Sequence, residues 1–292
     1  MEELANNTQV LVLMGFFPSA KADAAAEAAQ RLEIPLLALT QRKDITLTRT
    51  FVFRDFLTQR LMLQALLNYT ANTLGWQRYA ILYPNSKYGQ SLARQFSEET
   101  NRQAARLVGQ VSYSDGGRDV AQAVQTLSQI NPDAEGLPSL DAVFIPDEAN
   151  LVAAVAKAIA STPLAHVRVL GTNILHTPTT LEYGEVLSGI LFPDGFFAAD
   201  SDPAVKAFVA DYRQRFQQPP NYLAAQGYSS MRLLAETLNN FPGLTRGEFA
   251  QKLRHQTQPP GFSLFKGFNV DREAELTTKI LTISGTEFQL EY

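Results

Sequence analysis

The 292-residue chain contains no cysteine. This absence excludes disulfides, thiol catalysis and zinc–thiolate sites. Long hydrophobic runs are also missing: the longest, such as Val10–Met14, have the length of a strand, whereas a membrane span needs roughly 20 apolar residues. No segment has the pattern of a signal peptide. We therefore expect no direct membrane insertion by this chain, and its residues alone leave the compartment open.

Positive charge is scarce and dispersed. The formal net charge is −4 and no cluster of Lys and Arg is present. Nucleic-acid binding normally needs a concentrated basic stripe. The sequence therefore predicts no nucleic-acid partner.

Motifs of catalysis and cofactor binding are also missing. The sequence has no G-x-S-x-G, no P-loop and no G-x-G-x-x-G. His166, His176 and His255 lie far apart, without the i, i+4 spacing of a helical metal site, so we interpret each as a surface or structural histidine. These absences favour a binding protein over an enzyme and imply no cofactor and no metal.

Short apolar strands alternate with amphipathic helices through the first two thirds of the chain. Strands are predicted at Val10–Met14, Ile34–Leu39, Tyr79–Tyr83, Leu107–Tyr113, Ala142–Ile145 and Val167–Leu170, with helices between them. This order predicts an α/β fold of parallel sheets with helices on both faces, and the length suits two lobes. Successive helices follow Phe192, the last with capping-box spacing at Thr245 and Glu248, before a C-terminal hairpin of Lys279–Ile283 and Phe288–Glu291.

Polar residues that follow the first strands are candidate ligand contacts, because ligands of open α/β sheets bind at the carboxyl ends of strands. Ser19 begins a helix, so its hydroxyl group and nearby N–H groups could hold a carboxylate, although it could equally only cap that helix. Thr40, Gln41 and Arg42 follow the second strand. Arg42 could pair with a carboxylate, with a solvated loop arginine as the slightly favoured alternative.

Later strands supply four more candidates. Tyr88 could stack on a ligand or pack in the core, with neither favoured. For Asp147 and Glu148 we favour a role at the helix N-terminus over ligand contact. Asn173 occupies the equivalent place after a later strand.

Several segments together resemble the type I periplasmic binding proteins of the branched-chain amino acid receptor kind. The resemblance covers nearly the whole chain, and its most specific part is Arg78–Gly89. The other segments that carry it are Gly15–Ser19, Ile34–Leu37, Phe51–Arg54, Asp141–Pro146 and Leu170–Asn173.

This resemblance implies two Rossmann-like lobes, residues 1–57 with 197–267 and residues 58–196 with 268–292. It implies a ligand between the lobes, held by hinge closure, with Ser19 on the ligand carboxylate and Tyr88 in the cleft. The expected ligand is small, polar and amino acid-like. The expected location is periplasmic or extracellular with a lipid anchor, and the expected partner is the permease of an ABC transporter.

Two departures from the family's usual residues argue against an aliphatic amino acid as the ligand. Asn173 stands where the family often has an acidic residue for the ammonium group, unless Asp147 or Glu148 replaces it. The loop Ala38–Arg42 is bulkier than usual and cationic. Four segments also resemble the lipoprotein activators of penicillin-binding proteins, which implies an alternative role in regulating a cell-wall synthase: Leu37–Arg42, Phe144–Asp147, Leu170–Asn173 and Asp194–Phe197.

The resemblance also implies two βα units that would precede Met1, including the central strand of lobe one. We expect a lobe without them to expose open sheet edges. Such edges favour association or swapping between molecules.

Overall fold

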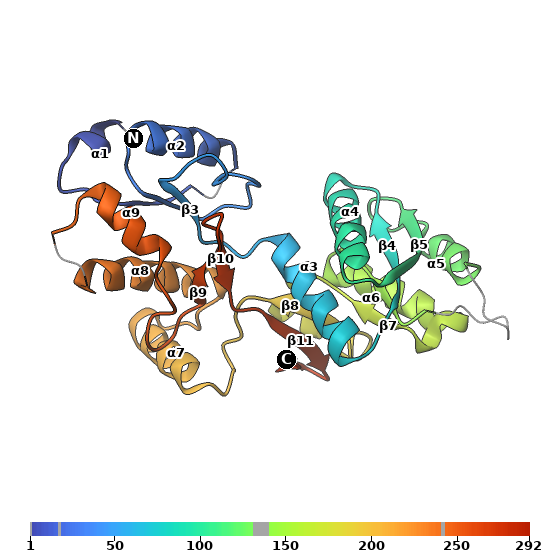
Figure 1. The fold of residues 1–292 in the computed structure, drawn as a ribbon. Coiled ribbons are helices and arrows are strands. Elements are labelled where there is room, and N and C mark those ends of the chain that lie inside the picture. The colour runs from blue at the N-terminus through green and yellow to red at the C-terminus, as the bar shows by residue number, and fades with distance from the viewer. Residues whose placement is uncertain (1, 17–18, 131–139, 241–242) are drawn as a thin grey trace. The chain divides into compact units, whose positions relative to one another are not determined.

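The computed structural model describes residues 2–16, 19–130, 140–240 and 243–292 (Figure 1). The chain forms two compact units. Unit 1 comprises Met1–Thr58 and Gly195–Thr277, and unit 2 comprises Gln59–Asp194 and Thr278–Tyr292. Within the described ranges, no helix combines the length and the hydropathy that a membrane crossing requires.

Unit 1 contains a three-stranded parallel sheet in the order β1-β2-β3 and a separate two-stranded hairpin of β9 and β10. Its strands are β1 (Leu13–Gly15), β2 (Leu36–Ala38), β3 (Val52–Arg54), β9 (Phe265–Phe268) and β10 (Ala274–Leu276). Its helices are α1 (Glu2–Asn6), α2 (Ser19–Arg31), α7 (Pro203–Phe216), α8 (Tyr222–Asn240) and α9 (Arg246–Arg254).

Helix α2 packs on one face of the small sheet (Figure 1). Its inward residues are alanines, and these small side chains allow the helix axis to approach the strands closely. The cluster that they form with the sheet consists of Ala22, Ala25, Ala26, Ala29, Ile34, Leu36, Ala38, Ile45 and Val52. The alanine-rich composition of α2 therefore determines how closely this helix packs on the sheet.

Unit 2 contains a seven-stranded sheet in the order β12-β11-β8-β7-β6-β4-β5. The strands from β8 to β5 are parallel, and β11 and β12 are antiparallel additions. The strands are β4 (Arg78–Pro84), β5 (Arg106–Tyr113), β6 (Ala142–Phe144), β7 (Arg168–Leu170), β8 (Leu191–Asp194), β11 (Lys279–Ser284) and β12 (Glu287–Leu290). The helices are α3 (Gln59–Asn68), α4 (Lys87–Arg102), α5 (Val120–Ser128) and α6 (Ala149–Ala160), with short turns η1 (Tyr69–Thr73), η2 (Pro163–His166), η3 (Asn173–Leu175) and η4 (Pro178–Tyr183).

An aromatic stack lies at the centre of unit 2. Phe96 of α4 is completely buried and stacks on Phe144 of β6 with ring centroids 4.3 Å apart. Tyr79 of β4 meets the edge of Phe96 at 5.9 Å. These contacts fix α4, and hence its first turn, against the parallel strands.

The α/β architecture with parallel sheets confirms the predicted fold class. The capping box of α9 and the hairpin of β11 and β12 also form as predicted. Other predicted elements differ in detail. The strand predicted at Val10–Met14 is observed as β1 at Leu13–Gly15, so Val10–Val12 lies outside it. Helix α3 continues beyond Asn68 as the π-helical turn η1. The hairpin of β9 and β10 was not predicted.

Strand β1 forms an open edge of the three-stranded sheet. Its residues are half-exposed, and no charged residue lies between Val10 and Gly15. The N–H of Leu13 and the carbonyl of Gly15 form hydrogen bonds on the side of β2. The backbone N–H and C=O groups of Met14 therefore point away from β2. An uncharged edge of this kind can pair with another chain.

We expect the protein to self-associate at high concentration and Met14→Lys to suppress that association, because a charge on the edge opposes pairing. Light scattering over a concentration series measures this. Val270→Lys is the control, since Val270 is 79% exposed in the hairpin turn. A wild-type protein that stays monomeric throughout would contradict the prediction.

Candidate ligand-binding site

The carboxyl ends of the parallel strands of unit 2 bring together residues from distant parts of the sequence. Tyr88 lies in the first turn of α4, directly after β4, and Thr172 and Asn173 follow β7. Asp147 follows β6. Strand order places β4, β6 and β7 side by side, so these side chains share one edge of the sheet.

Asp147 is held by two hydrogen bonds. Its Oδ2 accepts from the Tyr113 hydroxyl group at 2.8 Å, and its Oδ1 accepts from the backbone N–H of Glu148 at 2.8 Å. Burial raises the pKa of Asp147, and the bond from Tyr113 opposes that rise. Burial beside the Asp147 charge also raises the pKa of Tyr113. This pair ties β5 to the start of α6.

Tyr88 is half-buried and packs against the core of unit 2. Burial raises the pKa of its phenol group. Tyr88, Thr172 and Asn173 also line a small recess of about 10 Å³ together with apolar residues. The other residues that line the recess are Gln59, Met62, Leu63, Leu92 and Pro193.

The candidates of unit 1 are engaged with other parts of that unit. The Arg42 guanidinium forms an ion pair with Asp23 of α2 at 2.7 Å, and this carboxylate raises the pKa of Arg42. Thr40 is fully buried and its hydroxyl oxygen accepts from the backbone N–H of Arg42. Gln41 is exposed, and its amide donates to the carbonyl of Leu57 at 3.4 Å.

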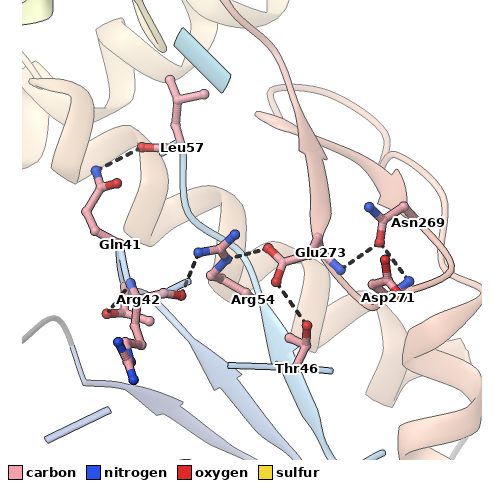
Figure 2. A network of polar contacts seen from close by, with 9 residues as sticks. Gln41, Arg42, Thr46, Arg54, Leu57, Asn269, Asp271 and Glu273 are labelled. Atoms are coloured by element: carbon pink, nitrogen blue, oxygen red, sulfur yellow. Dashed lines mark hydrogen bonds and ion pairs between the residues drawn. The ribbon is translucent and has the colours of Figure 1, made fainter. Parts of the chain in front are cut away.

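Figure 2 shows the polar network that anchors the loop after β2. Arg54, the last residue of β3, donates to the carbonyl of Arg42 and forms an ion pair with Glu273. Glu273 also accepts from the Thr46 hydroxyl group at 3.0 Å. One carboxylate at the start of β10 therefore joins the loop, the strand β3 and the hairpin.

A buried carboxylate lies where the chain leaves β3. Asp55 is completely buried, and its Oδ2 accepts from the Ser230 hydroxyl group at 2.7 Å. Gln226 donates to the backbone carbonyl of Asp55 at 3.1 Å. Burial raises the pKa of Asp55 to about 6, against the lowering effect of Ser230 and Gln226.

We expect Asp55→Asn to stabilise unit 1 at pH 7 by on the order of 3 kcal/mol, since the pKa rises from 3.8 to about 6 and each pKa unit corresponds to about 1.4 kcal/mol. The folded state holds a proton on Asp55 between its ordinary pKa of 3.8 and about 6, so wild-type stability falls as pH rises through that window. Urea denaturation from pH 4 to 8 measures the slope. Asp211→Asn, at an exposed position of α7, is the control. An unchanged slope in Asp55→Asn would refute this account.

The structure thus brings Tyr88, Asp147 and Asn173 together at one sheet edge. Glu148 is exposed at the N-terminal position of α6, and its side chain makes no capping bond, whereas the neighbouring Asp147 bonds to the backbone there. Ser19 begins α2, but its side chain lies outside the description. Among the described residues, no three His, Asp or Glu side chains gather as a metal site.

Two residues of this edge were not predicted. Tyr113 ends β5 and Thr172 directly precedes Asn173, so both stand at the strand ends where polar ligand contacts are expected. No feature of the sequence marks the apolar residues of the recess. Met62 and Leu63 belong to the apolar face of α3, which has the pattern of a helix packed on a hydrophobic core.

A comparison with family models matches residues 1–276 to the family described as periplasmic binding protein. The chain belongs to this family. A search of curated proteins finds no match.

Solved structures of periplasmic binding proteins share the fold. An ABC transporter substrate-binding protein from Desulfitobacterium hafniense in complex with Leu is 21% identical, with a TM-score of 0.72 over 99% of this chain and 82% of that one. A branched-chain amino acid transporter substrate-binding protein from Streptococcus pneumoniae, in complex with isoleucine, is 19% identical, with a TM-score of 0.65 over 100% and 81%. A solute-binding protein from Rhodopseudomonas palustris in complex with 3,4-dihydroxybenzoic acid is 22% identical, with a TM-score of 0.65 over 100% and 80%.

Proposed function

We propose that this protein binds a small organic carboxylate outside the cytoplasm and serves an ABC transporter without catalysing a reaction. The observation that carries the proposal is the recess of unit 2, where Tyr88, Thr172 and Asn173 present polar groups beside an apolar floor. Polar groups over apolar surface at the carboxyl ends of parallel strands are typical of small-molecule sites. The family and its amino acid- and aromatic acid-bound relatives support the same class of ligand.

In the proposed mechanism, separate groups of residues hold the carboxylate of the ligand and the remainder of the ligand. The N-terminus of α2, with Ser19, holds the ligand carboxylate, because unpaired N–H groups and the helix dipole favour an anion there. Tyr88 and Asn173 hold the remainder of the ligand. Ligand contacts stabilise a closed state over an open one by hinge closure, and the membrane permease recognises that closed state.

Five further candidate residues are proposed to support the site rather than contact the ligand: Thr40, Gln41, Arg42, Asp147 and Glu148. Arg42 and Asp147 are tied to Asp23 and Tyr113, so they shape the loops around the site rather than contact the ligand. We also propose that the mature protein carries a lipid anchor.

The test is a thermal-shift screen of small carboxylates, including leucine, isoleucine, benzoate and 3,4-dihydroxybenzoate. A ligand at 100 times its Kd stabilises the folded state by about 2.7 kcal/mol. Asn173→Ala is expected to reduce the shift, and Asn101→Ala, at an exposed position of α4, serves as control. A shift that survives Asn173→Ala would remove Asn173 from the site. If no carboxylate produces a shift, the transport function fails and the cell-wall regulatory alternative is favoured.

A further inference from the structure

A second pocket of unit 2 lies at the amino ends of the parallel strands, whereas the recess lies at their carboxyl ends. It is formed where β7 and β8 begin, beside the last turn of α6 and the loop that precedes β8. Its volume is about 370 Å³, against about 10 Å³ for the recess. Pockets of roughly 300–1,000 Å³ are typical of small-molecule sites, so this pocket has room for a compact organic ligand.

Arg168, the first residue of β7, brings a positive charge to this pocket. A Cβ atom at Gly189 would lie 3.2 Å from Nη1 of Arg168, so the guanidinium group lies over the bare backbone of Gly189, which also lines the pocket. Among the residues that the structure describes, no carboxylate forms an ion pair with Arg168. A guanidinium group can bind a carboxylate through two parallel N–H donors, so Arg168 is suited to an anionic ligand.

Two acidic residues neighbour the segments of this pocket without lining it. The backbone carbonyl of Asp141 accepts from the N–H of Arg168, but its carboxylate accepts from the backbone N–H groups of Gln77 and Arg78, both at 2.8 Å. Glu185 is exposed, and neither acidic residue lines the pocket. The pocket therefore presents a cation to its contents, with no acidic side chain in its described lining.

Neutral groups complete the lining. Nδ1 of His166 lies 3.0 Å from the carbonyl of Pro163, and because a carbonyl oxygen only accepts, Nδ1 carries the proton. Ser188 adds a hydroxyl group, which can donate a hydrogen bond. The other side chains are aliphatic, Ile159 of α6 and Val186 among them. One cation and two polar groups beside aliphatic surface favour a ligand that is charged at one end and apolar at the other.

We propose that this pocket is a second binding site, which takes a small organic carboxylate with an apolar body. Arg168 binds the carboxylate, and the aliphatic side chains contact the body of the ligand. A neutral ligand of the same shape loses the charge-assisted pair with Arg168, so the charge decides which compounds bind. This site is separate from the recess of Tyr88 and Asn173 and does not depend on the proposed function.

Histidine NMR spectroscopy on the whole chain tests the proposal, because the sequence has three histidines and of these His166 lines the pocket. The probes are benzoate and benzamide, which have nearly the same shape and differ in charge. We expect benzoate to shift the His166 signals saturably with a Kd of about 1 mM or tighter, and benzamide to bind about tenfold more weakly or less. Equal binding of benzamide, or a His166 signal that benzoate does not shift, overturns the proposal. Benzoate that shifts only His176, which directly follows η3, binds near the recess instead and also overturns it.

Two variants with matched controls locate the ligand. Arg168→Gln removes the charge and is expected to weaken benzoate binding about tenfold. Arg94→Gln, at an exposed position of α4, is its control. Ala156→Leu fills part of the pocket from α6 and is expected to weaken both probes, whereas Ala154→Leu changes an exposed position of the same helix outside the lining.

Circular dichroism and thermal melting establish that the four variants fold. Unchanged benzoate affinity in folded Arg168→Gln or in folded Ala156→Leu overturns the proposal. Loss of affinity in these two variants, with the two controls unchanged, supports it.

Discussion

Phe96→Ala is expected to lower the free energy of unfolding by about 3–5 kcal/mol, the usual cost of removing a buried phenylalanine. Phe96 is completely buried between Phe144 and Tyr79, with a centroid distance of 4.3 Å to the parallel ring of Phe144. The substitution removes both ring contacts and leaves a cavity that rigid strands on one side cannot close. Chemical denaturation measures the loss.

The matched control is Phe216→Ala at the end of α7. Phe216 is 51% exposed and contacts Tyr212 and Arg215 at the surface. We expect this change to cost less than about 1 kcal/mol, because much of the ring is already in water. Equal losses in the two variants would show that the stack of Phe96 does not organise unit 2.

Gly89→Ala is expected to destabilise the first turn of α4 by about 2–3 kcal/mol, in the range of overpacking substitutions. A Cβ atom at this position would lie 2.2 Å from the carbonyl oxygen of Pro84 and 2.7 Å from its ring. The backbone at the end of β4 cannot move away without breaking its pairing with β5. The helix start must move instead, and Tyr88 moves with it, so ligand affinity is expected to fall together with stability.

Gly227→Ala separates crowding from helix propensity. Gly227 lies within α8, and a Cβ atom there would meet no other atom within 4 Å. Alanine is the better helix former, so this variant is expected to gain about 0.5–1 kcal/mol. The melting temperatures of the two variants are then expected to shift in opposite directions from that of the wild type. A neutral Gly89→Ala would show that the turn after β4 adapts, and that Tyr88 is not fixed by this contact.

Local patterns in the sequence predicted most of the elements. A continuous apolar run predicts a strand covered on both faces, and β4 and β6 are of this kind. The capping box of Thr245 and Glu248 forms as predicted, because its hydrogen bonds join residues three apart in the chain. Such features depend on near neighbours, so the amino-acid order alone specifies them.

The hairpin of β9 and β10 shows where this reasoning fails. Its register shifts between Glu275 and Leu276, and Arg272 in its turn has a left-handed φ of 63°. The shift interrupts the alternation of inward and outward side chains on which strand prediction relies. Contacts with distant residues stabilise this turn instead, including the bond from Arg272 to the carbonyl of Thr46.

The sequence by itself determined the alternating α/β order and the presence of Tyr88, Asp147 and Asn173 at strand ends. Only the tertiary structure decided which of the candidate groups are engaged with partners inside their own unit. Arg42 pairs with Asp23 and Asp147 accepts from Tyr113, 19 and 34 residues away. Asp55 owes its raised pKa to burial, and the hydrogen bonds that oppose the rise come from α8, which follows it by more than 160 residues. Charge pairing, desolvation and hydrogen bonding act through space, so they depend on which segments the fold brings into contact.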